Sequence, residues 1–433
     1  MRKILFSFVC IASVFLLSCN ESGLNADEAV TIESRSFANK SMNEAITIAI
    51  DAAERLYPTQ SRGYGHTASV KNVKSVTNPL SRAGENDTLL YVVNFDNEEG
   101  YAIIPAPNID KKVLAVVENG SYDPEKGSDN PGFNYFMEAA KSYTANAAKN
   151  IKDSIIIVFP GELHPAFDSR TDTIAHYQIK PRLEGMEWGQ TGIYNVFCPK
   201  IGAVNAATGC VPTAIASIIT GVKKVSDGTS SFSFTFPDNT FGTQNINWNE
   251  LSLHKRQFIT YTRNNGTKVY QQQLCNENYP YNAHNLIAAL MRQIGYDGNA
   301  NYGVSSTPVA KNKCKSLLEK YLAGHKISKF RDFKFDTAKT SLNLCILFMA
   351  GDGHAWVADG YDQLDYHYYF AKWDFQNKVW IVEKNANFSD RLIHFCWGWD
   401  GVDDGYFEGE VFNAFDYTFK KTQFISITVD YAQ

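Results

Sequence analysis

A cysteine and a histidine far apart in the chain lie where they could act as a nucleophile and its base. Cys210 follows Gly209, and the apolar residues after it recur at helical spacing, so we expect a helix that begins at Cys210. The N-terminus of a helix favours a thiolate and lowers the pKa of a thiol placed there. This position predicts a reactive thiol, although by itself it also fits a small buried residue at a helix start.

His354 is the histidine best placed to accept the thiol proton. It follows a glycine-rich turn that contains Gly353, and it is the first residue of an apolar run that predicts a strand. A ring at a strand start can face across a cleft, and the glycine leaves space for a substrate backbone. The alternative is a strand-end histidine satisfied by a carbonyl. Zinc binding by His354 and His394 would need further ligands at suitable spacing, so we predict no metal and no cofactor.

Two further segments complete the set of candidate residues. Gln190 precedes Cys210, and its side-chain amide beside the backbone N–H of Cys210 would form a pocket for the oxyanion of an acyl-transfer intermediate. Trp397 and Trp399 lie in a glycine-rich turn after another predicted strand. They would shield the ion pair that a Cys210 thiolate and a His354 imidazolium would form, and they would line the substrate cleft. The alternatives are a surface glutamine and a packed hairpin end.

The elements before residue 160 predict a small α+β unit over residues 37–160. It opens with a helix, because Ser41 and Glu44 form a capping-box pattern before apolar residues at helical spacing that end at Pro58. The following strands and the second helix, which Asp129 or Asn130 would cap, are expected at Leu89–Phe95, Gly100–Ile104, Val113–Val117 and Pro131–Tyr143.

The first residues predict export. Residues 1–18 combine a basic start with an apolar run too short to span a bilayer, which indicates a signal peptide. The run ends at Ser18-Cys19, which resembles the lipobox of bacterial lipoproteins and makes Cys19 the lipidation candidate. The alternative is plain secretion. Residues 19–36 are polar and predict a flexible tether.

Residues 161–180 form a polar stretch without sustained periodicity, which predicts an exposed connector and a place for an activating cleavage. A second unit, residues 181–433, carries all the candidate catalytic residues. The 433 residues carry a formal charge of -5 and no basic run after the leader, so nucleic acid is not an expected partner. Of eight cysteines, Cys10 and Cys19 lie in the leader; the other six form no C-x-x-C pair, and their disulfide pairing stays open.

Four motifs, taken in order, resemble the streptopain family of papain-like cysteine peptidases. They are W-G-Q, A-A-T-G-C-V-P-T-A-I-A, G-H-A-W-V-A-D-G-Y-D and W-G-W-D-G-V-D-D-G-Y-F. The resemblance extends to Asn285–Gly295 and Tyr302–Ser306, and Tyr91–Asp123 is similar to part of the family's inhibitory propeptide. It implies that Cys210 is the nucleophile, His354 the general base and acid, and Gln190 the oxyanion donor. Trp397 would shield the histidine, and Tyr302, Ser305, Trp399 and Gly353 are substrate-cleft candidates.

The resemblance also implies a fold and an activity. The expected fold class is α+β: a two-lobed papain-like domain, with a helical lobe and an antiparallel β lobe, preceded by a small α+β propeptide domain. The expected activity is a latent endopeptidase that acts on proteins or peptides, with its own propeptide as intramolecular inhibitor. The only expected membrane contact is the lipid anchor, in a bacterial cell envelope.

This sequence departs from the family pattern at two positions. Cys396 stands where the family commonly has asparagine, and Asp400 stands where glycine is frequent. A thiol cannot orient an imidazole as an amide would, so we expect a backbone carbonyl to orient His354.

Two other functions fit the same residues. A thiol and an imidazole also serve amidases and acyltransferases that act on cell-wall peptides, and the change at Cys396 is compatible with a surface-binding lipoprotein whose active site has decayed.

Overall fold

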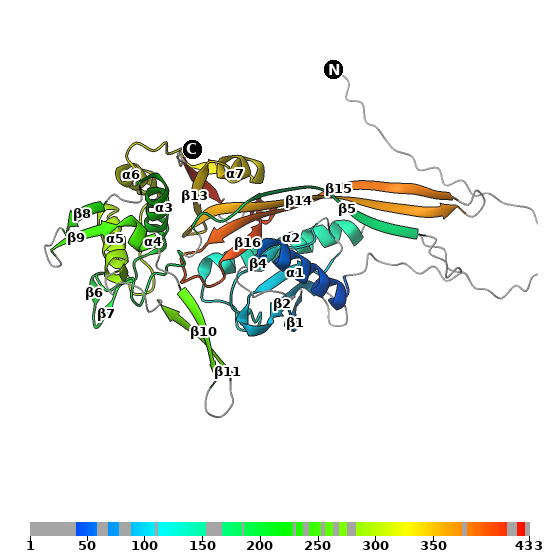
Figure 1. Cartoon of the computed structure of the whole chain (residues 1–433), viewed down its shortest axis with the longest axis horizontal. Coiled ribbons are helices and arrows are strands. Elements are labelled where there is room, and N and C mark those ends of the chain that lie inside the picture. The colour runs from blue at the N-terminus through cyan, green and yellow to red at the C-terminus, as the bar shows by residue number, and fades with distance from the viewer. Residues whose placement is uncertain are drawn as a thin grey trace, which may run out of the picture.

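The computed structural model describes residues 40–58, 68–77, 88–107, 109, 111–152, 167–183, 186–227, 231–236, 242–252, 256–262, 268–274, 283–374, 379–413 and 422–428. The leader, the tether and Cys19 lie outside these residues. Helices and strands are segregated rather than alternating, which gives the α+β class (Figure 1).

One large antiparallel sheet runs through the molecule in the order β1-β2-β3-β4-β16-β15-β14-β13-β17-β12, with β5 paired to β14. Its centre is the hairpin of β14 and β15. His354 is the first residue of β14 and Trp397 directly follows β15, so both lie at the open end of the hairpin. The strands from β12 onward are Arg331–Asp332, Cys345–Gly351, His354–Asp374, Val379–Cys396, Gly405–Glu408 and Gln423–Thr428.

The helical lobe packs on one side of this sheet, at the left of Figure 1. Helix α3, Cys210–Asp227, lies at its centre and contacts α4, α5 and α6. Apolar residues of α3 and α5 form one buried core with strands β13, β14 and β17, which fixes the start of α3 against the sheet. The other elements of this lobe are α4 Trp248–Ser252, α5 Ala283–Asp297, α6 Lys311–Tyr321, and strands β6 Lys200–Ile201, β7 Val204–Asn205, β8 Ser231–Thr235, β9 Thr243–Asn247, β10 Arg256–Thr262 and β11 Lys268–Leu274.

The N-terminal unit extends the same sheet instead of forming its own. Strand β4 pairs with β16 through three residue pairs, Ala115↔Phe407, Val116↔Tyr406 and Val117↔Gly405. Helix α2 packs on the sheet, where its phenylalanines share a core with Trp356 and Trp397. The elements of this unit, hereafter the N-terminal unit, are α1 Met42–Leu56, β1 Val70–Thr77, β2 Thr88–Phe95, η1 Asp96–Glu98, β3 Tyr101–Pro105, β4 Ala115–Val117 and α2 Pro131–Lys152.

The local signals in the N-terminal unit are confirmed. Ser41 and Glu44 make both hydrogen bonds of the capping box at the start of α1. Asn130, not Asp129, caps α2, because its Oδ1 accepts the backbone N–H groups of Gly132 and Phe133. Strand β1 was not predicted, since most of its side chains are exposed or half-buried and lack an apolar pattern.

The prediction of an irregular connector over residues 161–180 is wrong for most of its length. Residues Phe167–Ile179 form strand β5, which pairs with β14 from Lys372↔Phe167 to Tyr361↔Ile179. Backbone hydrogen bonds to β14 hold this polar segment, so no side-chain pattern revealed it. Residues 153–166 lie outside the described part of the chain.

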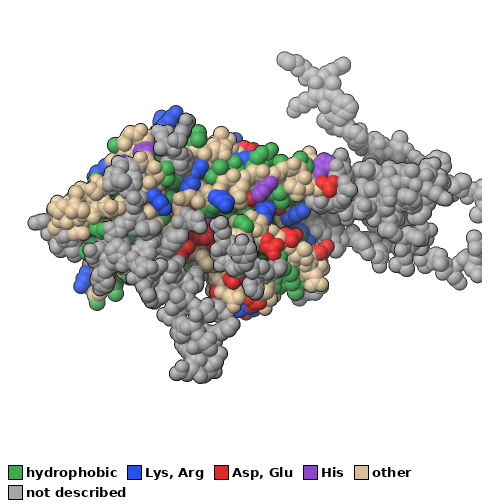
Figure 2. Space-filling view, viewed as in Figure 1, with side chains coloured by type: hydrophobic (Ala, Val, Ile, Leu, Met, Phe, Trp, Pro, Cys, Tyr) green, Lys and Arg blue, Asp and Glu red, His purple; other side chains and the backbone are tan. Residues whose placement is uncertain are grey.

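Two remaining elements, α7 Phe335–Leu342 and η2 Gly409–Asn413, cover the sheet next to α2. No helix within the described ranges is long and apolar enough to cross a membrane. On the face drawn in Figure 2, Lys and Arg side chains are scattered rather than gathered in one patch.

Candidate active site

The structure brings the predicted nucleophile and base together where α3 meets β14. Cys210 is the first residue of α3, and His354 is the first residue of β14, as the sequence predicted. The backbone N–H of Ala355, the residue after His354, is close enough to the Cys210 thiol to lower its pKa. The two residues therefore meet across the junction of the lobes, although no hydrogen bond joins their side chains in the described part of the chain.

The charge state of Cys210 differs from the expectation. The N–H groups of Ala355, Val211 and Cys210 itself all lower the pKa of the thiol, as a helix start should. Burial acts against them and is larger, so the pKa of Cys210 is raised above its usual value. Cys210 is therefore a neutral thiol in this structure, which includes the N-terminal unit.

A backbone carbonyl orients His354, as predicted from the replacement at Cys396. The ring nitrogen Nε2 lies 3.0 Å from the carbonyl oxygen of Trp397. A carbonyl only accepts hydrogen bonds, so Nε2 carries the proton and Nδ1 holds the lone pair of the neutral ring. Burial lowers the pKa of His354 to about 4, which outweighs the opposite effect of the Trp397 carbonyl.

Three tryptophans surround the histidine, one of which was not among the predicted residues. The ring of Trp356 stacks on His354 at 6.1 Å between centroids, and the ring of Trp399 meets it edge-on at 6.4 Å. Trp397 is fully buried, and its ring packs on Trp356 at 5.1 Å. Trp397 thus supplies the carbonyl, while Trp356 and Trp399 cover the ring. Trp356 stands two residues after His354, so period-2 alternation along β14 would have found it.

Gln190 is tied to both sides of the junction. Its side-chain Nε2 donates to the carbonyl of Gly398 at 3.2 Å, next to Trp397. Its backbone carbonyl accepts the N–H of Thr208 at 2.9 Å, in the segment that leads into Cys210. The backbone N–H of Asp400 donates to the carbonyl of Trp188, which lies in the same W-G-Q motif as Gln190. Asp400 has φ +60°, and this left-handed conformation explains why glycine is frequent at its position.

The four substrate-cleft candidates do not all face the junction. Gly353, beside His354, has open space where a side chain would lie, and Trp399 contacts His354. Ser305 is exposed. Tyr302 points elsewhere: its hydroxyl packs on Gly295 of α5 and makes hydrogen bonds to Arg292, at a separate pocket on the helical lobe. Tyr302 therefore lines that pocket, and its place in the substrate cleft stays a prediction.

Helix α2 of the N-terminal unit covers the histidine. A Cβ atom built on Gly132, in the first turn of α2, would lie 2.3 Å from the ring of Trp397 and 2.8 Å from Cδ2 of His354. The backbone of α2 is therefore in direct contact with the ring. This contact accounts for part of the burial that keeps His354 neutral.

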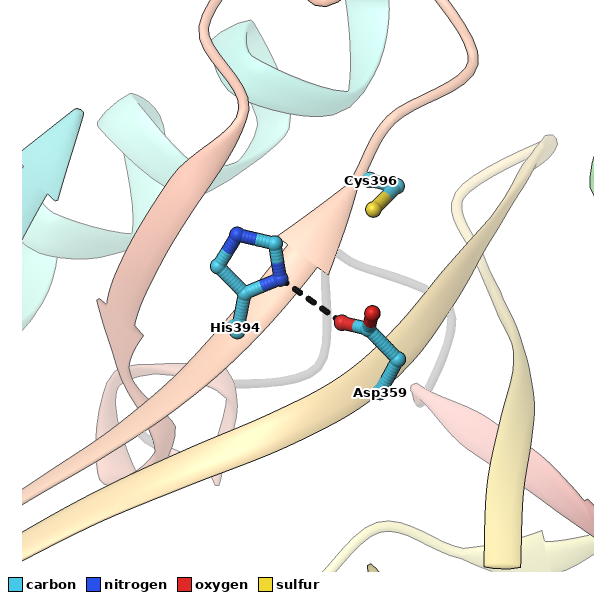
Figure 3. A group of neighbouring side chains, drawn as sticks. All are labelled: Asp359, His394 and Cys396. Atoms are coloured by element: carbon cyan, nitrogen blue, oxygen red, sulfur yellow. Dashed lines mark hydrogen bonds and ion pairs between the residues drawn. The ribbon is translucent and has the colours of Figure 1, made fainter. Parts of the chain in front are cut away.

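Sequence reasoning missed a second cluster of ionisable residues behind the site. Asp359 of β14 and His394 and Cys396 of β15 place a ligand-type atom each within 4.8 Å of one another (Figure 3). Within this cluster, Asp359 and His394 form an ion pair. Asp359 accepts from His394 Nδ1 at 2.7 Å and from the backbone N–H of Leu183 at 2.6 Å, so both of its oxygens are occupied. Residues 359 and 394 are far apart in sequence, and only the register of β14 on β15 reveals the pair.

Each of the cysteines 198, 210, 314, 345 and 396 is a free thiol. These are the cysteines that the structure describes after the leader, and Cys275 is not among them.

The fold and the site define the chain as a cysteine peptidase. The model of the peptidase C10 family matches residues 188–407, which are about half of the chain and include Cys210, His354 and Gln190, and the chain belongs to this family. Streptopain of Streptococcus pyogenes is 23% identical over 359 residues, which cover 75% of this chain and 74% of streptopain.

Two solved structures from Prevotella intermedia are also similar. A prointerpain A fragment matches 84% of this chain and 99% of its own, at 19% identity and a TM-score of 0.48. Active interpain A cysteine protease matches 57% of this chain and 94% of its own, at 19% identity and a TM-score of 0.34.

Proposed function

We propose that the chain is the latent precursor of an exported cysteine endopeptidase, with Cys210 as nucleophile and His354 as general base and acid. The observation that carries this proposal is the junction itself, where the thiol at the start of α3 meets the start of β14. With Nε2 of His354 held by the Trp397 carbonyl, Nδ1 remains as the base.

In the proposed reaction, His354 takes the thiol proton and the sulfur of Cys210 attacks a peptide carbonyl carbon. The new S–C bond forms as the carbonyl oxygen becomes an oxyanion, which the Gln190 amide and the Cys210 backbone N–H stabilise. Collapse breaks the C–N bond, and the His354 imidazolium returns its proton to the leaving amine. Water, activated by the same ring, then hydrolyses the thioester and frees Cys210.

The N-terminal unit is the inhibitory prodomain in this proposal, and latency has an electrostatic cause. The reactive form of such a site is a thiolate beside an imidazolium, whereas burial keeps both Cys210 and His354 neutral in the precursor. Removal of α2 would expose the ring of His354 to water and raise its pKa. We infer that the activating cut falls in residues 153–166, so that β5 stays on β14 in the mature enzyme.

Export is the remaining part of the proposal. A precursor lipidated at Cys19 would be held at the bacterial cell envelope, by the outer membrane or at the cell surface, and processing would release the peptidase. Cys19→Ser should abolish incorporation of labelled fatty acid and shift the protein from the detergent phase to the aqueous phase. An unchanged partition would remove Cys19 as the anchor.

The experiment that tests the activity compares the purified precursor with its Cys210→Ala variant. We expect the wild-type chain to shorten itself and then digest casein, and the variant to do neither. Peptidoglycan fragments serve as the second substrate, because an amidase would release peptides from them and leave casein intact. Equal casein digestion by both proteins would contradict the role of Cys210.

A further inference from the structure

His394 forms a buried ion pair that spans the prodomain and the catalytic domain. Its Nδ1 lies 2.7 Å from Asp359 of β14, and its Nε2 lies 2.9 Å from Glu118, which directly follows β4 of the prodomain. The side chains of His394 and Asp359 are 4% and 0% exposed, while Glu118 is 26% exposed. In the close-up view the ring of His394 stands beside β15, with Nδ1 turned to Asp359 of β14 (Figure 3).

The geometry requires His394 to be an imidazolium. Carboxylate oxygens only accept hydrogen bonds, so a ring that faces one carboxylate from each nitrogen must carry a proton on both. Burial alone would lower the pKa of His394, but Asp359, Cys396 and Glu118 together raise it well above its usual value. The ionisable groups around this ring come from every neighbouring element: Asp359, Cys396, Asp404, Tyr406, Tyr57 and Glu118.

The opposite end of β4 carries the opposite charge. Lys111, four residues before β4, is buried, and its ammonium lies 3.0 Å from Glu410 and 3.7 Å from Glu408. It also donates to the carbonyl of Ser389 at 2.7 Å. The prodomain thus places a cation, Lys111, before β4 and next to Glu408 and Glu410. It places an anion, Glu118, directly after β4 and next to His394.

These two charges matter because the backbone pairing of β4 with β16 does not by itself select one register. Backbone hydrogen bonds between β4 and β16 form whatever the side chains are, and this ladder has three residue pairs. Its register must be fixed by side chains. A slipped strand would withdraw Glu118 from His394 and Lys111 from Glu410, leaving buried charges without partners.

We propose that His394 is a recognition site for a single carboxylate, Glu118, and that it acts with the Glu408 and Glu410 pair to set the register of the prodomain strand on β16. This inference rests on the proposed latency, because it names how the catalytic domain recognises its inhibitor. The partner it selects is the chain's own prodomain. A segment with a cation or a neutral residue at the position of Glu118 would dock poorly.

The test uses full-length precursors with Glu118→Gln, Glu118→Lys or, as the matched control, Glu98→Gln. Glu98 is a partly exposed carboxylate that pairs with Lys71 inside the prodomain. The rate of self-conversion should rise roughly tenfold for Glu118→Gln, and further for Glu118→Lys, because a buried cation loses or repels its partner. The Glu98→Gln control should convert at the wild-type rate. The mature enzymes from the wild type and from the three variants should have equal kcat/KM.

A second readout separates this inference from the proposed activity. In the inactive Cys210→Ala precursor, thermal unfolding of Glu118→Gln, His394→Gln and the double variant forms a double-mutant cycle. The inference predicts that the double variant melts close to His394→Gln alone. Additive shifts, or wild-type conversion by Glu118→Gln, would overturn the recognition role, whereas a wild-type precursor that never becomes active would contradict only the peptidase proposal.

Discussion

At the scale of single residues, burial shifts the pKa values of the two groups proposed as catalytic in opposite directions and leaves both uncharged. It raises the pKa of the Cys210 thiol and lowers the pKa of the His354 imidazole to about 4. The helix start at Cys210 still contributes through the N–H groups of Val211 and Cys210. A local pattern reveals that contribution, but it cannot reveal the larger one, because the burial comes from segments distant in sequence.

The first prediction concerns the oxyanion pocket. Gln190→Ala should lower kcat/KM of the mature enzyme by about a hundredfold or more, since one oxyanion donor is typically worth about 3 to 4 kcal/mol. Steady-state hydrolysis of a fluorogenic peptide measures this loss. Gln293→Ala is the control, because Gln293 is equally buried and bonds to Asp297 within α5. Full activity in Gln190→Ala would remove Gln190 from the mechanism.

The second prediction concerns the contact that closes the site. Gly132→Ala places a methyl group where the rings of Trp397 and His354 lie, so α2 must shift. We expect the variant precursor to convert several-fold faster than the wild type, measured by gel densitometry over time. Glu138→Ala, an exposed change on the same helix, should leave the rate unaltered. Unchanged conversion in Gly132→Ala would show that the contact does not hold the prodomain.

At the scale of elements, the sequence predicted the helix start at Cys210 and the strand start at His354, but not how the strands pair. The starts of α3 and β14 followed from local patterns around Cys210 and His354, and both are confirmed. The partner of His354 was predicted as a backbone carbonyl, yet its identity as Trp397 depends on β14 pairing with β15. The same pairing creates the ion pair of Asp359 and His394, which no local signal announces.

The third prediction is that protonation of His354 in acid weakens the closure of the precursor, that is, the docking of α2 on the site. Neutral His354 has a pKa of about 4 in the closed form, against roughly 6.5 for an exposed histidine. The open form therefore binds the proton more readily. The contribution of His354 to closure is fully present above about pH 6.5 and falls by on the order of 3 kcal/mol as the pH approaches 4.

Trypsin susceptibility of the Cys210→Ala precursor, followed from pH 7 to pH 4.5, measures this opening. Buried carboxyls act in the opposite direction: burial raises the pKa of Glu408 to about 8, so its contribution to closure is lost as the pH rises. The comparison that isolates His354 is therefore Cys210→Ala with and without His354→Gln. The pH dependence should be smaller with His354→Gln, and identical curves would contradict the prediction.

At the scale of the whole molecule, the prodomain and the catalytic domain share one sheet and one core. Phe136 of α2 packs on Phe407 of β16 at 4.8 Å between ring centroids. The sequence correctly placed a small α+β unit before the catalytic segments. It could not show that β4 continues the catalytic sheet, because Ala115–Val117 is a short apolar run with no partner specified locally.

The fourth prediction follows from the shared core. The Cys210→Ala precursor should unfold in one cooperative transition in calorimetry, and Phe136→Ala should lower the stability of that whole transition by about 3 to 5 kcal/mol. Ile174→Ala, at a side chain that is 55% exposed, is the matched surface control and should change little. Two separate transitions, with only the first affected by Phe136→Ala, would show that the units fold independently.

The most direct test of the central claim is the site at which iodoacetamide alkylates the mature enzyme at pH 5.5, mapped by peptide mass spectrometry. An ordinary thiol is protonated and slow at this pH, whereas a thiolate held by an imidazolium reacts. The account predicts rapid modification of Cys210 alone, slowed at least about tenfold by His354→Gln. Reaction at Cys396 instead, or a Cys210 as slow as a free thiol with or without His354, would contradict it.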